Sequence, residues 1–378
     1  MPSQQFIRLS DQQYSALTKL LHRLIDQLSA NVIIEPLAPK TGFWFGGGNI
    51  VQDASGVLWL SGRYRNFGDS RTGLVAGARG LEVAVFRSDD GGRSFEKVSS
   101  WTKPELSHSG PAIVSYEGTS LHPRDDGVWE LFVSSEKDRP YPSPLETMQK
   151  PGTGVWSIDV LTGTSPDAMD ASTFAPVLSN DEFPEYLHVK DPVVYDARDG
   201  STHLIFCSHP FSWSSSNSGL AIRAAGETDF AVDSWEIVRR GPAWDVAATR
   251  ITCRMPIPQT GLFRDEPPMS VYFYDGAECL RSHEENVRAV SRPRGYSCEE
   301  IGGAFIVADG DFASATRLSE LAPFFVSPYG TGASRYVDVL QTESGWLASW
   351  EQGQSNGSQP LVGHFVSRGE IDAILNGD

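Results

Sequence analysis

The chain has 378 residues, of which 40% are hydrophobic and 11% aromatic, and it carries a formal net charge of −17. This acidic balance argues against a nucleic-acid partner, whose phosphates require a basic surface, although a locally basic pocket could still bind a small anion. No apolar stretch is long enough to span a membrane, and the N-terminus lacks the basic start, apolar core and cleavage site of a signal peptide. We therefore expect a cytoplasmic protein without membrane contact.

Residues 10–29 predict a helix near the N-terminus. Ser10 or Asp11 can cap its start. Its apolar residues share one broad face, as an amphipathic helix requires: Tyr14, Leu17, Leu20, Leu21, Leu24, Ile25 and Leu28. Residues 31–36 then have the composition of a strand, and almost everything from Phe43 onward predicts further short strands.

Glycine-centred turns recur along the rest of the chain. Gly56, Gly127, Gly200 and Gly345 each join an apolar segment to an aromatic one, at intervals of about 70 residues or twice that. The missing turn falls in residues 260–266. Such turns are typical of β-hairpins, and five hairpin units in series predict an all-β protein, a five-bladed β-propeller with an N-terminal α-helix.

The turns divide the chain into five predicted blades. We assign them to residues 43–100, 110–162, 188–240, 249–309 and 329–368. The strand at 31–36 would be the outer strand of the last blade and would close the ring. Residues 1–40 then hold the helix and the ring-closing strand, and residues 41–378 form the propeller.

One local motif supports this fold. Residues 88–95 read Ser-Asp-Asp-Gly-Gly-Arg-Ser-Phe, which resembles the Asp-box of sialidases and other propeller proteins. In those proteins the Asp side chain binds the backbone of the turn between the two outer strands of a blade. The resemblance concerns the fold and implies nothing direct about chemistry.

The innermost strand of each propeller blade lines the central axis, so the first strand of each blade is where chemistry is expected. Each predicted first strand contains a polar or charged residue within an otherwise apolar segment, which is costly to bury without a partner. The candidates are Asn49, Glu117, His188, Lys190, Asp191, Arg254, Arg335 and Tyr336. A shared polar pocket on the axis accounts for all of them.

Two short motifs resemble those of five-bladed glycoside hydrolases, the invertases, arabinanases and their relatives. Lys190-Asp191-Pro192 is similar to their [R/K]-D-P signature, and Glu117-Gly118 is similar to the setting of their general acid. The resemblance implies that Glu117 and Asp191 form an acid/base pair, because glycosidic cleavage uses two carboxylates. The chain departs from the family at Asn49, where those enzymes have an Asp, and in the order of its acids.

Basic residues are the second group of candidates. Arg63 and Arg65, at the end of the second strand of blade 1, join Lys190, Arg254 and Arg335 as substrate-binding candidates, together with Asn49. Guanidinium groups suit a bidentate grip on carboxylate, sulfate or phosphate, which predicts a sugar with an acidic group. The alternative is structural: the arginines tie loops to carbonyls and acids, with Asp191 orienting Lys190 or Arg254 and Glu117 paired with an arginine.

The leading functional prediction is a hydrolase that cleaves a terminal glycosidic bond of an oligosaccharide or glycoside, with Asp191 as base or nucleophile and Glu117 as acid. The first alternative is a polysaccharide lyase, in which an arginine or Asn49 neutralises a uronate while Tyr336 or His188 removes a proton. The second is a propeller that binds sugar or protein without catalysis.

No metal or cofactor is predicted, because no two histidines have metal-ligand spacing. The cysteines lack such spacing too, which predicts buried free thiols at Cys207, Cys253, Cys279 and Cys298. The sequence leaves the oligomeric state open.

Overall fold

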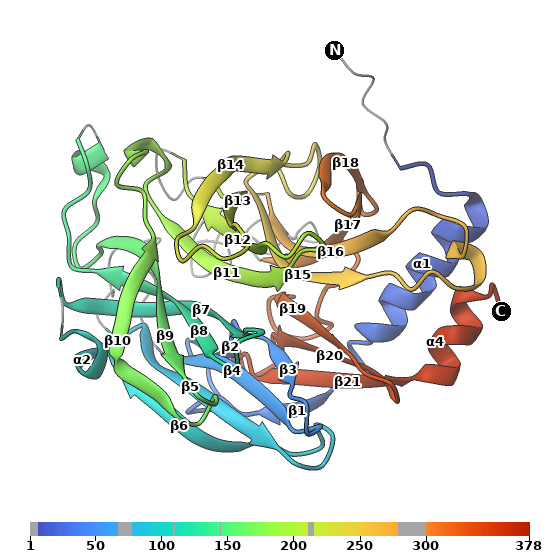
Figure 1. The fold of residues 1–378 in the computed structure, drawn as a ribbon, viewed down its shortest axis with the longest axis horizontal. Coiled ribbons are helices and arrows are strands. Elements are labelled where there is room, and N and C mark those ends of the chain that lie inside the picture. The colour runs from blue at the N-terminus through green and yellow to red at the C-terminus, as the bar shows by residue number, and fades with distance from the viewer. Residues whose placement is uncertain (1–6, 67–77, 109, 144, 211–214, 279–299) are drawn as a thin grey trace.

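The computed structural model describes residues 7–66, 78–108, 110–143, 145–210, 215–278 and 300–378. Their strands form five antiparallel sheets around a common axis, which confirms the predicted five-bladed propeller (Figure 1). Cys207 and Cys253 are buried free thiols, whereas Cys279 and Cys298 lie outside the described residues.

The first three blades follow one another along the chain. Blade 1 contains β2 (Trp44–Gly46), β3 (Ile50–Gln52), β4 (Leu58–Arg65), β5 (Gly80–Ser88) and β6 (Glu96–Thr102). Blade 2 contains β7 (Ile113–Pro123), β8 (Trp129–Lys137), β9 (Val155–Gly163) and β10 (Met169–Leu178). Blade 3 contains β11 (Val189–Asp196), β12 (Thr202–Ser208), β13 (Asn217–Arg223) and β14 (Ala231–Val238).

The last two blades complete the circle. Blade 4 contains β15 (Ala248–Pro256), β16 (Met269–Ala277), β17 (Ile301–Ala308) and β18 (Asp311–Arg317); blade 5 contains β19 (Ser334–Gln341), β20 (Gly345–Gln352), β21 (Leu361–Ser367) and β1 (Asn31–Ile34). β1 pairs antiparallel with β21, so the N-terminal strand closes the ring as predicted. The inner strands also form a closed circle, since β3, β7, β11, β15 and β19 each contact the next.

Two outer strands lie beyond the predicted blade ends at residues 162 and 309. The residues of β10 and β18 at the rim are mostly exposed or partly exposed. Neither shows a clear alternation of apolar and polar residues, which is the signal that identifies a strand in a sequence. The prediction therefore placed the ends of blades 2 and 4 too early.

Few helices accompany the strands: α1 (Asp11–Leu24), α2 (Lys103–Leu106), α4 (Arg368–Leu375) and the short 3₁₀ turns η1 (Leu145–Met148), η2 (Pro184–Tyr186) and η3 (Gly261–Phe263). Ser10 and Gln13 form a capping box at the start of α1. α1 ends short of residue 29, because the Asp26 side chain accepts the backbone N–H groups of Leu28 and Ser29 in a turn. None of the helices in the described ranges has the length and apolar character that crossing a bilayer requires.

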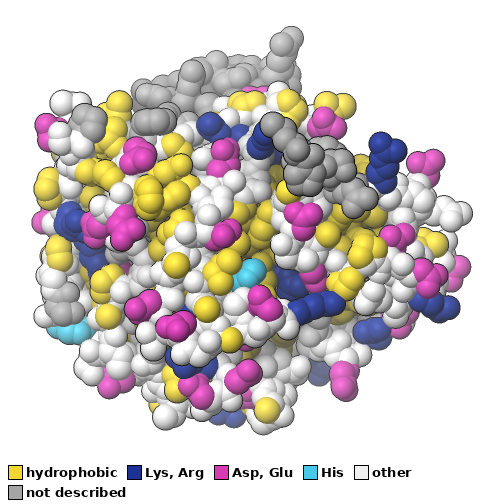
Figure 2. All heavy atoms as spheres, turned by 45° about the horizontal axis from the view of Figure 1, so that its top comes forward, with side chains coloured by type: hydrophobic (Ala, Val, Ile, Leu, Met, Phe, Trp, Pro, Cys, Tyr) yellow, Lys and Arg dark blue, Asp and Glu magenta, His cyan; other side chains and the backbone are white. Residues whose placement is uncertain are grey.

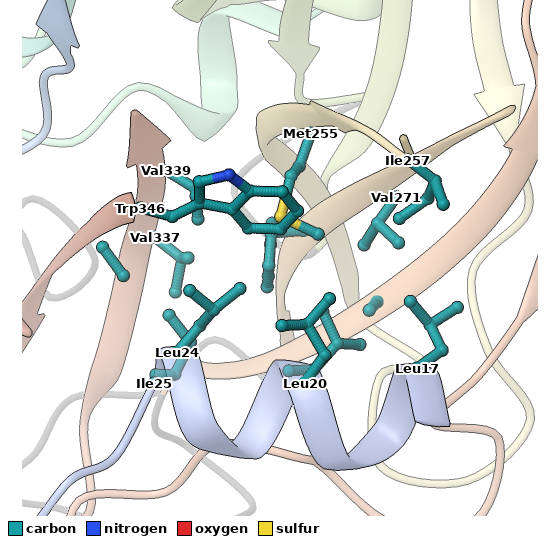
Figure 3. Close-up of a cluster of buried hydrophobic side chains, with 14 of the residues drawn as sticks. Leu17, Leu20, Leu24, Ile25, Met255, Ile257, Val271, Val337, Val339 and Trp346 are labelled. Atoms are coloured by element: carbon teal, nitrogen blue, oxygen red, sulfur yellow. The ribbon is translucent and has the colours of Figure 1, made fainter. Parts of the chain in front are cut away.

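α1 fills the wedge between blades 4 and 5, where it lies beside α4 (Figure 1). Figure 3 shows Leu20 and Leu24 of α1 pointing toward Met255 of blade 4 and Trp346 of blade 5. The leucines have no exposed surface. Burying such a side chain contributes about 1.5–3 kcal/mol, so the helix is a substantial part of the joint between the two blades.

The turn between β5 and β6 is organised by one carboxylate. Asp90 accepts the backbone N–H groups of Arg93 and Ser94 at 2.9 and 3.0 Å, and the hydroxyls of Ser88 and Ser94 at 2.8 and 2.6 Å. Its contacts are therefore confined to the turn, and the segment that resembles an Asp-box serves the local fold.

Candidate active site

Four inner strands carry a β-bulge near their start. Relative to the neighbouring strand, β7, β11, β15 and β19 each gain an extra residue at Glu117–Gly118, Asp191–Pro192, Thr252 and Tyr336–Val337, and β7 has a second irregularity between Ile113 and Ser115. The inner edge of blade 1 is interrupted instead, between β2 and β3. Bulges often lie beside active sites because they redirect a side chain, and here three of them carry predicted catalytic residues.

Two of these bulge residues meet across the axis. The Tyr336 hydroxyl of blade 5 donates to Asp191 Oδ1 of blade 3 at 3.0 Å, and the Gly118 N–H of blade 2 donates to the same oxygen at 3.1 Å. Asp191 and Tyr336 both adopt left-handed backbone conformations, with φ of 55° and 53°. Such conformations are strained for residues other than glycine and concentrate at functional sites.

Charged side chains of alternating sign surround this pair, and we call them the axial charge ring. In order around the axis the ring consists of Asp191, Arg250, Glu300, Arg335, Glu351, Arg63 and Glu117, with ion-pair distances of 3.2, 3.0, 2.6, 2.8, 2.5 and 3.6 Å. The hydrogen bond from Gly118 to Asp191 closes the circle. The ring thus links all five blades.

Further cations and one acid branch from the ring. Arg65 Nη1 donates to both oxygens of Glu117 at 3.1 and 3.0 Å. Lys190 Nζ lies 3.3 Å from Asp191 Oδ2, and Arg250 Nη2 donates to Asp275 Oδ2 at 2.7 Å. The charges at the axis are therefore closely paired, whereas acidic side chains are scattered over the face in Figure 2.

The cations set the ionisation of the two predicted catalytic carboxylates. Burial favours the neutral form of Glu117, but Arg65 and Arg63 overcome it and hold the pKa of Glu117 below its usual range. Burial acts on Asp191 in the same way, and Lys190 and Arg250 lower its pKa. Both are therefore anionic at neutral pH. Burial raises the pKa of Tyr336 well above its ordinary value, so Tyr336 keeps its phenol proton.

Three guanidinium groups of the ring face the Tyr336 ring. The Cζ atoms of Arg250, Arg63 and Arg335 lie 4.4, 5.3 and 5.5 Å from its centroid. Nε of Arg250 and of Arg63 and Nη2 of Arg335 are buried and have no hydrogen-bond partner among the described residues. Buried donors without acceptors cost free energy, so the site is suited to a ligand that supplies oxygen acceptors.

The glycines of blade 1 make room for the ring. A Cβ atom on Gly46 would lie 2.4 Å from Cγ of Glu351, and one on Gly48 would lie 2.0 Å from the backbone oxygen of Ser61. Gly47 and Gly48 also line a narrow axial cavity together with Asp191 and Tyr336. The backbone of blade 1 therefore approaches its neighbours closely at the axis, and the Glu351 side chain of blade 5 occupies the space beside Gly46.

The structure places the predicted residues Asn49 and His188 outside the charge ring. The Asn49 amide accepts the N–H of Leu121 at 2.8 Å and donates to its oxygen at 2.9 Å, which ties blade 1 to blade 2. The His188 side chain is fully buried, accepts the Trp156 N–H at 3.3 Å and packs against Tyr141. Burial lowers the pKa of His188 well below its ordinary value, so it is neutral.

The structure corrects the placement of Arg254. Its Nη2 lies 3.1 Å from Asp309 Oδ2, and its guanidinium lies 4.7 Å from the centroid of the Tyr195 side chain. Neither contact belongs to the axial charge ring. Arg250 occupies the axial position instead. Residues four apart on a regular strand share a face, but the bulge at Thr252 shifts the register by one residue and turns Arg254 to the opposite face.

Sequence reasoning missed Arg250, Asp275, Glu300 and Glu351. Asp275 and Glu351 lie near the ends of the second strands β16 and β20, each within an apolar or aromatic run. The rule used for first strands, that a charge in an apolar strand needs a buried partner, would have found both. Glu300 precedes β17 and shows no such pattern. Within the described ranges, no group of three or more His, Cys, Asp or Glu residues could hold a metal ion.

No protein-family model matches the sequence, and no curated protein is similar to it in sequence. Solved structures do resemble it. A glycoside hydrolase aligns over 95% of this chain and 96% of its own, with 10% identity and a TM-score of 0.60. The protein BT0996, solved in a complex with RGII, aligns over 93% of this chain and 95% of its own, with 10% identity and a TM-score of 0.60.

A third structure, the α-L-arabinofuranosidase from Lactobacillus brevis, aligns over 88% of this chain and 92% of its own, with 13% identity and a TM-score of 0.54. Identities this low establish a common architecture and leave individual residues unassigned. The chain therefore shares its propeller fold with glycoside hydrolases.

Proposed function

We propose that the chain is a glycoside hydrolase that cleaves the bond of a terminal, acidic sugar at the axial charge ring. The observation that carries the proposal is the hydrogen bond between Asp191 and Tyr336. Both residues lie in bulges and in strained backbone conformations, and they meet across the axis of a fold that glycoside hydrolases share. Strain held in place by the surrounding structure is a reason to look for function at that point.

The carboxylates take different parts in this reaction. Asp191 is anionic, which suits a base or nucleophile at the anomeric carbon. It lines an axial cavity of about 10 Å³, so a sugar reaches this carboxylate only if the cavity widens. Glu117 is also anionic in the free protein, because Arg63 and Arg65 hold it so. An acidic substrate that pairs with these arginines weakens their stabilisation of the Glu117 carboxylate, and its negative charge raises the pKa of Glu117. Glu117 then takes up the proton that the leaving oxygen needs.

The acidic group of the substrate is inferred from the arginines. Arg63, Arg250 and Arg335 are already paired with carboxylates, yet each has a buried N–H without an acceptor among the described residues. A carboxylate, sulfate or phosphate offers several oxygens in one plane or cluster and fits such donors. A neutral sugar offers hydroxyls that can satisfy the same donors, so the substrate charge needs its own test.

The contacts give less support to the lyase alternative. A lyase needs a base for the proton next to the uronate carboxylate. Tyr336 keeps its proton because burial raises its pKa, and His188 is fully buried, where it accepts the backbone N–H of Trp156 and packs against Tyr141. Hydrolysis is therefore the reaction that the described residues favour.

The test is turnover of aryl glycosides and uronate-containing oligosaccharides by the wild type and four variants. Asp191→Asn and Glu117→Gln should each lower kcat/KM by roughly 10²-fold or more, the usual loss for a general acid or base. Arg335→Met should lower kcat/KM for acidic sugars, because it removes a charge-assisted hydrogen bond to the substrate. Arg254→Met is the matched control. It removes the same kind of side chain outside the charge ring and should leave turnover within about threefold.

Each outcome has one meaning. Turnover of neutral but not acidic sugars would keep the hydrolase and reject the acidic substrate. A product with a new ultraviolet-absorbing double bond would show a lyase. Sugar binding without turnover, unchanged in the carboxylate variants, would show a binding protein. Full turnover by Asp191→Asn would reject the assigned centre.

A further inference from the structure

Asp275 joins the Asp191–Tyr336 pair from behind. Its two oxygens accept the backbone N–H of Tyr336 at 3.1 Å each, and Oδ2 also accepts Arg250 Nη2 at 2.7 Å. Arg250 Nη1 in turn donates to Asp191 at 3.2 Å. Asp275 therefore reaches Asp191 by two routes, through Tyr336 and through Arg250, and the four residues form a closed circuit of hydrogen bonds.

Asp275 lies behind the residues that line the axial cavity. It lies on β16, the second strand of blade 4, with 1% of its surface exposed, and it does not line the cavity. Yet it binds the backbone of the bulge residue in blade 5, where φ is positive. A strained conformation persists only where neighbours hold it, and this carboxylate supplies two of the contacts that do so.

We propose that Asp275 is a positioning residue whose carboxylate holds Tyr336 and Arg250 against Asp191, and that uptake of a single proton by Asp275 releases this hold. A neutral carboxyl group loses its ion pair with Arg250. Its hydroxyl proton also leaves only one good acceptor for the Tyr336 N–H. The effect on turnover rests on the proposed function, whereas the effect on Tyr336 does not.

The groups that face Asp275 set the pH at which this happens. Burial raises the pKa of Asp275 to about 7, Arg250 on β15 opposes the rise, and Glu300 before β17 adds to it. Tyr336 on β19 donates its N–H, and Asp191 lies beyond Arg250. Asp275 is therefore mostly protonated below neutral pH and mostly ionised above it, so the hold strengthens as the pH rises through neutrality.

The direct reporter is the backbone amide of Tyr336. The full chain is labelled with tyrosine carrying ¹⁵N at the amide and ¹³C at Cζ, and the Tyr336 signals are identified as those missing from Tyr336→Phe. In the wild type we expect this signal to move with a midpoint near neutral pH, and the ¹³Cζ signal of its phenol to move with the same midpoint. In Asp275→Asn both signals should stay in place across that range.

Asp338→Asn is the matched control. Asp338 lies on the same strand as Tyr336, and burial raises the pKa of its carboxyl to about 6, but it accepts the N–H of Ile50 and has no contact with Arg250. Its removal should leave the titration of Tyr336 unchanged. A Tyr336 signal that titrates equally in Asp275→Asn, or that does not titrate in the wild type, would overturn the proposal.

Turnover gives the second readout, on whichever glycoside the wild type hydrolyses. We expect wild-type kcat to rise through the same midpoint, and Asp275→Asn to lose this limb and to have roughly tenfold or more lower kcat above it. If Asp275→Asn does not fold, Asp275→Glu should shift the midpoint. A wild type that hydrolyses nothing would reject the proposed function, while the amide titration would still test the hold of Asp275 on Tyr336.

Discussion

Each carboxylate of the axial charge ring touches two cations. Glu117 contacts Arg63 and Arg65, and Glu351 contacts Arg63 and Arg335. Buried ion pairs add little net stability compared with apolar side chains, but removing one partner leaves an uncompensated charge in the interior. Removing almost any one charged side chain of the axial charge ring should therefore destabilise the fold. The ring can thus be tested by unfolding measurements as well as by activity.

Glu117→Gln should destabilise the fold. Its loss leaves Arg63 and Arg65 with less negative charge, so we expect the free energy of unfolding to fall by about 3–5 kcal/mol, measured by urea unfolding. Asp89→Asn is the control, because Asp89 pairs with Arg87 at the surface and should change stability by less than about 1 kcal/mol.

The difference in the free energy of unfolding between the wild type and Glu117→Gln should depend on pH with a definite sign. The pKa of Glu117 is lower in the folded chain than its unfolded value of 4.5, so its stabilisation is complete above that pH. It is lost as the pH falls and the folded carboxylate takes up a proton. The gap between wild type and Glu117→Gln should therefore shrink on acidification, and a constant gap would contradict the ion-pair explanation.

The candidate site could be predicted in part from the sequence. Glu117, Asp191 and Tyr336 interrupt apolar first strands, and the structure brings them together at the axis. Arg250 could not be chosen over Arg254, because that choice depends on a bulge that no sequence pattern marks. The same reasoning would have identified Asp275 if it had been applied to the second strands of the blades.

At the scale of the strand, the inner edge of each blade is shaped by a departure from regular pairing. Four strands use a bulge, and blade 1 uses glycine. Turn glycines, being frequent and regular, predicted the number of blades. The outer strands β10 and β18 could not be predicted, because a strand at the rim buries too little apolar surface to leave an alternating pattern.

Gly48→Ala tests the close approach in blade 1. The added Cβ would lie 2.0 Å from the backbone oxygen of Ser61, and because backbone cannot rotate away, we expect a loss of roughly 1–3 kcal/mol or more. Gly369→Ala is the control. A Cβ there meets nothing within 4 Å, and alanine in a helix should stabilise by up to about 1 kcal/mol. Equal melting temperatures of the two variants would rule out the steric argument.

At the scale of the molecule, two features join the blades. The axial charge ring connects all five at the centre, and α1 fills the outer wedge between blades 4 and 5 (Figure 3). The helix and the ring-closing strand precede the propeller in the sequence, yet both are integral to its last blades. Residues 1–40 and 41–378 are thus packed together as one body in the described ranges.

Leu20→Ala tests the wedge. Leu20 is completely buried between blades, so truncation should lower the free energy of unfolding by about 2–5 kcal/mol. Leu28→Ala, at a position that is 76% exposed, should change it by less than about 0.5 kcal/mol. Chemical unfolding of both variants measures the difference, and comparable losses would mean that α1 contributes little to the joint.

The closure of the last sheet by β1 has a consequence for biosynthesis. The ribosome releases α1 and β1 before β21 and α4, to which they bind. Until then, the leucine face of α1 has no folded surface to pack against, and it resembles the exposed apolar segments that chaperones bind. The ring can close only after β21 and α4 have been released, so translation stalled before them should yield an open, protease-sensitive arc.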